Sequence, residues 1–128
     1  MRLRNVKNKE EILNSCDILI KDFGGVKGKW QKEFNNNNPI YIEIGMGKGK
    51  FIIENAIRYP NINFIGIEKY DSVLARAVQK VPSDIKNLRF VRVDAKNIND
   101  VFDKEVDRIY LNFSDPWPKD RHAIRRLT

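Results

Sequence analysis

Cysteine and histidine are nearly absent from this chain, which has one of each, Cys16 and His122. A single cysteine cannot form a disulfide within the chain, and it cannot supply the several thiolates of a structural zinc site. We therefore expect no intramolecular disulfide and no metal. Because the sequence shows no partner that would activate His122, we assign it a phosphate-contacting or structural role rather than that of a general base.

Long hydrophobic runs are also missing, since no apolar stretch approaches the roughly 20 residues that cross a bilayer. Residues 1–5 are basic, but no apolar segment of signal-peptide length follows them. From these two absences we expect a cytoplasmic protein that does not associate with membranes.

Acidic residues are outnumbered, because 17 Asp and Glu stand against 24 Lys and Arg among 128 residues, for a net charge of +7. Such an excess favours polyanionic partners, although a solvated basic surface has the same composition. The length allows one domain at most. The position of the charges along the chain must therefore decide between the two interpretations.

Residues 1–38 are polar and show little periodicity, and we interpret them as an N-terminal appendage to a core of residues 39–128. Apolar residues recur at helical spacing over residues 10–23, which predicts one short helix in this appendage. Gly24 and Gly25 should end that helix.

Strand and helix patterns alternate in residues 39–128. Short apolar runs predict four strands, at residues 40–44, 63–67, 88–93 and 108–113. Between them we expect a helix after Gly49, a second helix capped by Asp71 and a short helix around residues 98–102. This alternation predicts an α/β fold with a doubly wound parallel sheet and right-handed crossovers.

A glycine turn joins the first predicted strand to its helix, with Gly45, Gly47 and Gly49 at alternate positions. Glycines there permit a tight turn and let backbone N–H groups approach a ligand, although they can also serve packing alone. Glu68 ends the next predicted strand, where an acidic residue typically accepts hydrogen bonds from ribose hydroxyls. The spacing therefore predicts a nucleotide-type cofactor.

Two cofactors fit this architecture, a nicotinamide dinucleotide and S-adenosyl-L-methionine. Glu43 lies two residues before the first glycine, where its charge would repel a pyrophosphate but could pair with the cationic amino-acid end of S-adenosylmethionine. We therefore favour S-adenosylmethionine. Asp94 follows the third predicted strand and could accept a hydrogen bond from the adenine amino group, or it could be an N-cap or loop carboxylate.

Asp115 follows the fourth predicted strand, which in doubly wound sheets commonly neighbours the first. Ligands bind outside the carboxyl ends of such strands, so Asp115 should face the reactive end of the cofactor. Pro116 and Pro118 stiffen the loop around Trp117, which could stack on a base or simply cover the sheet.

A dense group of cationic residues follows this loop. It comprises Lys119, Arg121, His122, Arg125 and Arg126, with Asp120 as the one acidic residue among them. If this segment is helical, Arg121 and Arg125 share a face, as do His122 and Arg126. We expect these residues to bind RNA phosphates rather than to form only a solvated face.

Three blocks of this sequence resemble the bacterial tRNA (guanine-N7-)-methyltransferases. They are Glu43-Ile-Gly-Met-Gly-Lys-Gly49, then Gly66-Ile-Glu68, and above all Tyr110-Leu-Asn-Phe-Ser-Asp-Pro-Trp-Pro-Lys119 followed by Arg121-His-Ala-Ile-Arg-Arg-Leu-Thr128. The resemblance implies a Rossmann-like class I methyltransferase fold. It also implies methyl transfer from S-adenosylmethionine to N7 of a guanosine in the tRNA variable loop, at position 46.

The same resemblance implies roles for individual residues. It implies cofactor contacts at Glu43, Glu68, Asp94 and Asp115, a catalytic role for Asp115 and a substrate contact for Lys119. Asp120 and Ile124 stand where the family commonly has basic residues, so the local affinity for tRNA should be weaker.

The family continues beyond the block that ends at Thr128, so the chain resembles a C-terminally truncated member, and the resemblance does not imply that this shorter form is active. Counting the predicted strands in chain order, we expect the sheet order 3-2-1-4, with the fourth strand as an exposed edge. Such an edge should cause either reduced stability or self-association. Two other functions stay open: an amino-methyltransferase acting on adenine or cytosine of nucleic acid, and an inert module that binds RNA or cofactor.

Overall fold

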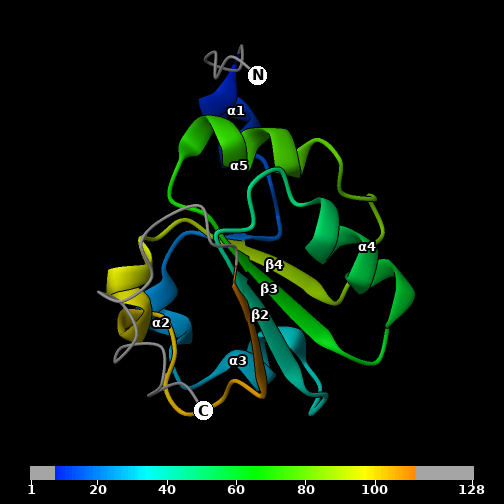
Figure 1. Ribbon diagram of the computed structural model, residues 1–128, viewed down its shortest axis with the longest axis vertical. Helices are drawn as coiled ribbons and strands as arrows, with labels where there is room; N and C mark the ends of the chain where they lie inside the picture. Colours follow the sequence, from blue (N-terminus) through cyan, green and yellow to red (C-terminus); the bar gives the residue numbers. More distant parts are fainter. Residues whose placement is uncertain (1–7, 112–128) are drawn as a thin grey trace.

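The computed structural model describes residues 8–111 of the chain (Figure 1). The strands are β1 (Leu19–Ile20), β2 (Ile40–Ile44), β3 (Asn63–Ile67), β4 (Leu88–Val91) and β5 (Arg108–Leu111). The helices are α1 (Lys9–Asn14), α2 (Phe23–Val26), α3 (Trp30–Phe34), α4 (Lys50–Arg58), α5 (Asp71–Val78) and the 3-10 helix η1 (Ala95–Asp100).

The five strands form one parallel sheet in the order β1-β4-β3-β2-β5. The four strands expected from the sequence, β2 to β5, are present. Their order confirms the prediction 3-2-1-4, and β5 lies at one edge of the sheet. The register places Glu43 of β2 between Gly66 of β3 and Tyr110 of β5. The α/β fold and its parallel sheet are therefore confirmed.

The helix predicted over residues 10–23 is wrong. Helix α1 ends at Asn14, and Leu19 and Ile20 form β1, which pairs in register with Phe90 and Val91 of β4. Apolar residues in a short segment suit either a helix face or a strand, and here pairing with β4 decides in favour of the strand. This segment therefore adds a fifth strand that the sequence did not reveal.

The two glycines expected to end that helix lie inside α2 instead. Asp22 is the N-cap of α2, and its side chain accepts a hydrogen bond from the backbone N–H of Gly25 at 3.3 Å. An aspartate at this position satisfies an N–H group that has no partner within the helix, which stabilises even a helix of one turn.

Two other local predictions also need correction. The N-cap of α5 is Tyr70, and Asp71 is the first helical residue, with its carboxylate paired to Arg92 rather than to the helix backbone. The short helix expected around residues 98–102 is a 3-10 helix that begins earlier, at Ala95. The ion pair with Arg92 engages the side chain of Asp71, and the cap at Asp94 sets the start of η1.

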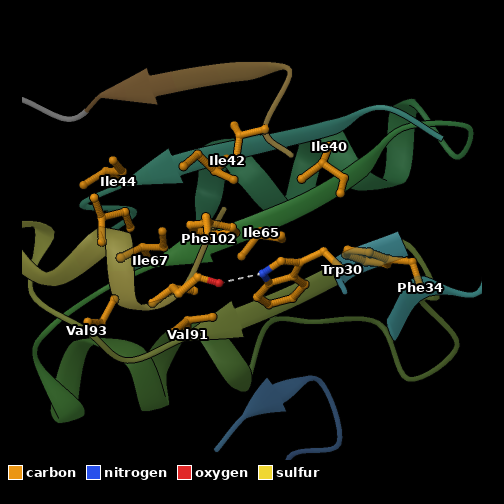
Figure 2. Close-up of a cluster of buried hydrophobic side chains, with 13 residues drawn as sticks. Trp30, Phe34, Ile40, Ile42, Ile44, Ile65, Ile67, Val91, Val93 and Phe102 are labelled. Atoms are coloured by element: carbon orange, nitrogen blue, oxygen red, sulfur yellow. Dashed lines mark hydrogen bonds between the residues drawn. The ribbon is translucent and has the colours of Figure 1, made fainter. Parts of the chain in front are cut away.

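Helices cover both faces of the sheet (Figure 1). On one face α1, α4 and α5 bury side chains such as Leu13, Ile52 and Leu74. On the other face α3 and η1 bury Trp30, Phe34 and Ile98 against β2, β3 and β4, as Figure 2 shows for the aromatic residues. This gives the layered arrangement expected when the sheet has two apolar faces.

Trp30 lies at the centre of the second face. Its side chain is fully buried, stacks against Phe102 and donates a hydrogen bond from Nε1 to the carbonyl oxygen of Val101 at 3.0 Å (Figure 2). The backbone N–H groups of Gly28 and Trp30 both donate to the carboxylate of Glu105, which precedes β5. Residues before Pro39 therefore pack into the same core as the sheet.

Within residues 8–111, no helix has the length and apolar character needed to cross a membrane. The same residues contain no group of three or more His, Cys, Asp or Glu side chains that could hold a metal ion.

Candidate functional site

Three carboxylates predicted from the sequence lie at one edge of the sheet. Glu43 is the second-to-last residue of β2, Glu68 directly follows β3, and Asp94 lies between β4 and η1. Because the three strands are parallel, their carboxyl ends meet at the same edge, where open α/β sheets bind ligands. The structure therefore brings these residues to a common region, as the sequence predicts.

The glycine turn leads from β2 into α4 along this edge. Gly45, Gly47 and Gly49 all have positive φ, at 75°, 60° and 82°. The backbone N–H groups of Gly45 and Met46 both donate to the carbonyl oxygen of Ile67, at 2.9 and 3.0 Å. These bonds hold the turn against the end of β3.

Glu68 fastens the turn more firmly. One of its carboxylate oxygens accepts a hydrogen bond from the N–H of Gly47 at 3.0 Å, and the other accepts one from the N–H of Tyr70 at 3.1 Å. The residue is only 7% exposed, so its position is well fixed. Each carboxylate oxygen has two lone pairs, and Glu68 therefore keeps the capacity to accept hydrogen bonds from a ligand's hydroxyl groups.

Glu43 is the chemically unusual residue of the site. It is buried, and its Oε1 has no hydrogen-bond partner among the described residues. Burial, and secondarily the negative charge of Glu68, raise its pKa from 4.5 to about 7. A buried acceptor without a donor is costly, so this position favours a ligand that brings a cation or a donor to it.

The glycines of the turn serve two different purposes. A Cβ added at Gly49 would lie 3.0 Å from Cδ1 of Ile53 and 3.1 Å from Cβ of Ala77, so this glycine allows α4 and α5 to pack closely. A Cβ added at Gly47 would have no described atom within 4 Å. The open side of the turn is therefore at Gly47, where a ligand could approach the backbone.

Gly66 has a structural role in the site region that the sequence did not reveal. It is buried in β3, and a Cβ there would collide with Sδ of Met46 and approach the ring of Phe90 to 3.1 Å. Met46 belongs to the glycine turn, so Gly66 makes room for that turn on the sheet. A glycine inside a strand pattern is the signal that could have indicated this close approach.

Asp94 acts as an N-cap in this structure. Its side chain accepts a hydrogen bond from the N–H of Lys96 at 3.1 Å and thereby caps η1. This is the structural alternative that the sequence left open. A contact between Asp94 and an adenine amino group stays a prediction.

The remaining predicted site residues lie outside residues 8–111. They are Asp115, Lys119, Arg121, His122, Arg125 and Arg126. The last described part of the chain is β5, which lies beside β2 with Leu111 paired to Ile44 at the carboxyl edge. The catalytic and RNA-binding roles of these residues stay predictions.

The residues present fit one of the two cofactors weighed from the sequence. The buried carboxylate of Glu43, whose Oε1 has no hydrogen-bond partner in the described part of the chain, matches a cationic group. The fixed carboxylate of Glu68 matches a pair of hydroxyls. Two carboxylates beside the glycine turn would oppose a pyrophosphate at close range. The site therefore suits S-adenosylmethionine better than a nicotinamide dinucleotide.

Comparison with known proteins gives an independent result. A family model described as "Putative methyltransferase" matches residues 37–128 of this chain. A tRNA (guanine-N(7)-)-methyltransferase of Lachnoclostridium phytofermentans is 58% identical over 130 residues, a match that covers 100% of this chain and 61% of the relative. One of Bacillus subtilis is 50% identical over 131 residues, covering 100% of this chain and 62% of that relative. The chain thus spans about three fifths of the length of these curated relatives.

Solved structures resemble the fold at low sequence identity. The antibiotic-resistance methyltransferase Kmr superposes with a TM-score of 0.66 at 18% identity, covering 79% of this chain and 59% of that protein. A 16S rRNA (adenine(1408)-N(1))-methyltransferase from Catenulisporales acidiphilia gives a TM-score of 0.62 at 16% identity, with 79% and 51% covered. These similarities show that the described sheet and helices have the class I methyltransferase fold.

Proposed function

This chain belongs to the methyltransferase family whose model matches most of its length, and from that premise we propose its reaction. It transfers a methyl group from S-adenosylmethionine to N7 of a guanosine in tRNA, in the variable loop at position 46. The observation that carries the proposal is the buried pair Glu43 and Glu68 around the open glycine turn. The identity of 58% to a tRNA (guanine-N(7)-)-methyltransferase supports the choice of substrate.

The described residues fit the cofactor in separate ways. Glu43 would pair with the ammonium group of the cofactor's amino-acid end, and Glu68 would accept hydrogen bonds from its ribose hydroxyls. The turn at Gly47 would leave space for the cofactor to approach the backbone. Asp94 is the predicted acceptor for the adenine amino group. When bound, S-adenosylmethionine supplies an electrophilic methyl group on a sulfonium centre.

Methyl transfer to guanine N7 depends mainly on the alignment of the reacting atoms. Guanine N7 carries an in-plane lone pair and needs no prior deprotonation, so holding N7 in line with the methyl carbon supplies most of the acceleration. The carboxylate of the predicted catalytic residue, Asp115, accepts hydrogen bonds from the N–H donors of the guanine edge. Its negative charge also stabilises the positive charge that the base acquires on methylation.

The basic group beyond β5 is the proposed contact with the tRNA. Its members Lys119, Arg121, His122, Arg125 and Arg126 would bind phosphates and so fix the orientation of the RNA. We place the protein in the cytoplasm because its proposed substrate is tRNA.

A methyl-transfer assay on bulk tRNA tests this proposal. Labelled S-adenosylmethionine should transfer label to tRNA, and mass spectrometry of the digested nucleosides should identify 7-methylguanosine. The assay compares this chain with a version extended by the C-terminal segment of a curated relative. N6-methyladenosine or N4-methylcytidine as the product would instead identify an amino-methyltransferase, and no transfer by either version would leave a binding module.

A substitution at Asp115 tests the assigned catalytic residue. In the extended version, Asp115→Asn should reduce turnover much more than it reduces affinity for S-adenosylmethionine, because the carboxylate acts mainly on the reacting base. Asp84→Asn, at an exposed position beyond α5, provides the control and should change neither quantity. Equal losses of turnover and cofactor affinity in Asp115→Asn would remove the catalytic assignment.

A further inference from the structure

A second concave region lies beside the candidate cofactor site. It is a cavity of about 460 Å³ lined by Lys9, Lys69, Tyr70, Asp71, Ser72, Val73 and Arg92. We call it the basic cavity. None of Glu43, Glu68, Asp94 and the glycines of the turn lines it, although the N–H of Tyr70 donates to Glu68. The cavity therefore adjoins the proposed contacts to the cofactor without including them.

Three segments that are distant in the sequence form the basic cavity. Lys69 and Tyr70 follow β3, Arg92 follows β4, and Lys9 begins α1, which packs against α5 (Figure 1). Since β3 and β4 are parallel, the cavity opens at the same edge of the sheet as the cofactor site. An extended polyanion at this edge could therefore contact the cavity while its reacting base lies at the site.

The charges of the basic cavity are mostly positive. Among the described lining residues, Lys9, Lys69 and Arg92 carry positive charge, and Asp71, which is paired to Arg92, carries negative charge. Arg92 and Lys69 are both exposed, so the positive charge is accessible from solvent. Backbone phosphates of nucleic acids bind where several such side chains converge.

An exposed aromatic ring lies next to these cations. Tyr70 is 56% exposed, and Nζ of Lys69 lies 5.1 Å from the centre of its ring. Single-stranded RNA bases stack on aromatic rings that a protein exposes at its surface. The combination of cations and an exposed ring distinguishes this cavity from a generally basic surface.

A second cation–aromatic pair lies elsewhere in the described part of the molecule, away from the residues that line the basic cavity. The guanidinium of Arg58 lies 5.7 Å from the centre of the ring of Tyr59, which is 44% exposed at the end of α4. That pair is at the opposite end of the sheet, because α4 begins at the glycine turn and runs away from the carboxyl edge (Figure 1). It supplies matched control positions for the pair Lys69 and Tyr70.

We propose that the basic cavity binds the phosphodiester backbone of the RNA substrate, with the ring of Tyr70 stacked on an adjoining unpaired base. The inference rests on the proposed function, because it takes tRNA as the substrate. It adds a contact formed by α1 and by the loops after β3 and β4, separate from the basic group beyond β5. Helix α1 thereby gains a role in positioning RNA.

Binding of an unmodified tRNA transcript tests the inference, measured by fluorescence anisotropy as a function of salt concentration. The double variant Lys9→Ala with Lys69→Ala should raise the Kd about tenfold and lower the slope of log K against log salt by roughly 1.5, as expected for two lost phosphate contacts. The control pair Lys29→Ala with Lys32→Ala removes two exposed lysines at α3. It should change both quantities much less.

A second comparison tests the aromatic contact. Tyr70→Ala should raise the Kd for tRNA several-fold, as expected for loss of stacking with one base, whereas Tyr59→Ala should not. Affinity for S-adenosylmethionine, measured without RNA, should be unchanged in all four variants. That readout also shows whether a variant has kept its fold.

Three outcomes would overturn the inference: no loss of tRNA affinity in the variants of the basic cavity, equal losses in the control variants, or no measurable tRNA affinity in the unsubstituted chain. Failure of the proposed function has a different signature. If the chain binds tRNA through this cavity but the extended version transfers no methyl group to guanosine, the inference holds and the proposed reaction fails.

Discussion

The carboxylate of Glu68 accepts a hydrogen bond from the backbone N–H of Gly47 at 3.0 Å, which joins the end of β3 to the glycine turn after β2. Glu43 lies on the neighbouring strand, and the charge of Glu68 contributes to the rise of its pKa. The two glutamates therefore have different tasks. Glu68 shapes the turn, and Glu43 keeps a buried Oε1 that has no hydrogen-bond partner among the described residues.

Glu43 should make the stability of the protein depend on pH. Its pKa of about 7 in the folded state lies above the ordinary value of 4.5, so the folded state holds the proton more tightly than the unfolded state does. The stability is then complete below pH 4.5, falls as the pH rises through about 7 and stays low above that. Glu43→Gln should be more stable than the unsubstituted protein at pH 8, by about 1 to 2 kcal/mol, and similar to it near pH 4.5.

Urea unfolding at the two pH values measures this difference. Glu54→Gln, at an exposed position of α4, removes a carboxylate of the same type and should show no such dependence on pH. An equal or lower stability of Glu43→Gln at pH 8 would show that the buried carboxylate is compensated by contacts other than the described ones.

Cofactor binding should release a proton from Glu43. A cationic ammonium group beside this carboxylate favours its ionised form, so affinity for S-adenosylmethionine should increase as the pH rises from 6 to 8. Isothermal titration calorimetry near pH 7, in buffers with different ionisation enthalpies, measures the proton released. Glu43→Gln should bind more weakly and release none, and unchanged proton release in that variant would exclude Glu43 as the source.

Gly47 and Gly49 should respond differently to alanine. Gly47→Ala strains the backbone at φ 60° but meets no described atom, so it should cost about 1 to 2 kcal/mol of stability and reduce cofactor affinity at least tenfold. Gly49→Ala adds contacts with Ile53 and Ala77 and should cost about 2 to 4 kcal/mol. Thermal unfolding and calorimetric titration measure the two effects.

Gly28→Ala separates strain from ligand contact. Gly28 has φ 77° and space for a Cβ. The nearest atoms to that Cβ would belong to Asp103, which is not part of the glycine turn. Gly28→Ala should lose stability like Gly47→Ala and keep its affinity for S-adenosylmethionine. If Gly47→Ala also keeps that affinity, the turn does not lie against the cofactor.

Trp30 should contribute to the stability of the whole sheet. Trp30→Ala removes a fully buried ring and leaves the carbonyl of Val101 without its donor, which should cost about 3 to 5 kcal/mol. Ile57→Ala truncates a side chain that is 57% exposed and should cost well under 1 kcal/mol. Urea unfolding followed by circular dichroism should show a single transition in both; a second, separate transition in the unsubstituted protein would mean that residues 1–38 form an independent unit.

The edge strand β5 should promote self-association of this chain. Among the described strands, β5 pairs only with β2, and an edge strand of this kind can pair with a strand of a second molecule. Light scattering coupled to size-exclusion chromatography should therefore show an average mass that rises with protein concentration. A monomeric mass at every concentration would contradict this prediction, and extension by a relative's C-terminal segment should reduce the association.

The core sheet could be predicted because its signals are local. Each of β2, β3, β4 and β5 is a short apolar run between turn residues, and right-handed crossovers leave few possible orders for them. Glu43, the glycine turn and Glu68 could be placed together for the same reason, since consecutive parallel strands end at one edge. The cavity beside them could not, because Lys9, Lys69 and Arg92 lie in three separate segments.

The sequence by itself determined the alternation of strands and helices, the glycine turn and the carboxylates at the strand ends, because these follow from periodicity and residue type within short stretches. Only the tertiary structure decided that Leu19 and Ile20 form a strand, since two residues acquire that conformation by pairing with Phe90 and Val91. It alone showed that Trp30 belongs to the core and that Oε1 of Glu43 is buried without a hydrogen-bond partner in residues 8–111. Burial and pairing depend on residues brought together from distant parts of the chain, and no local pattern records them.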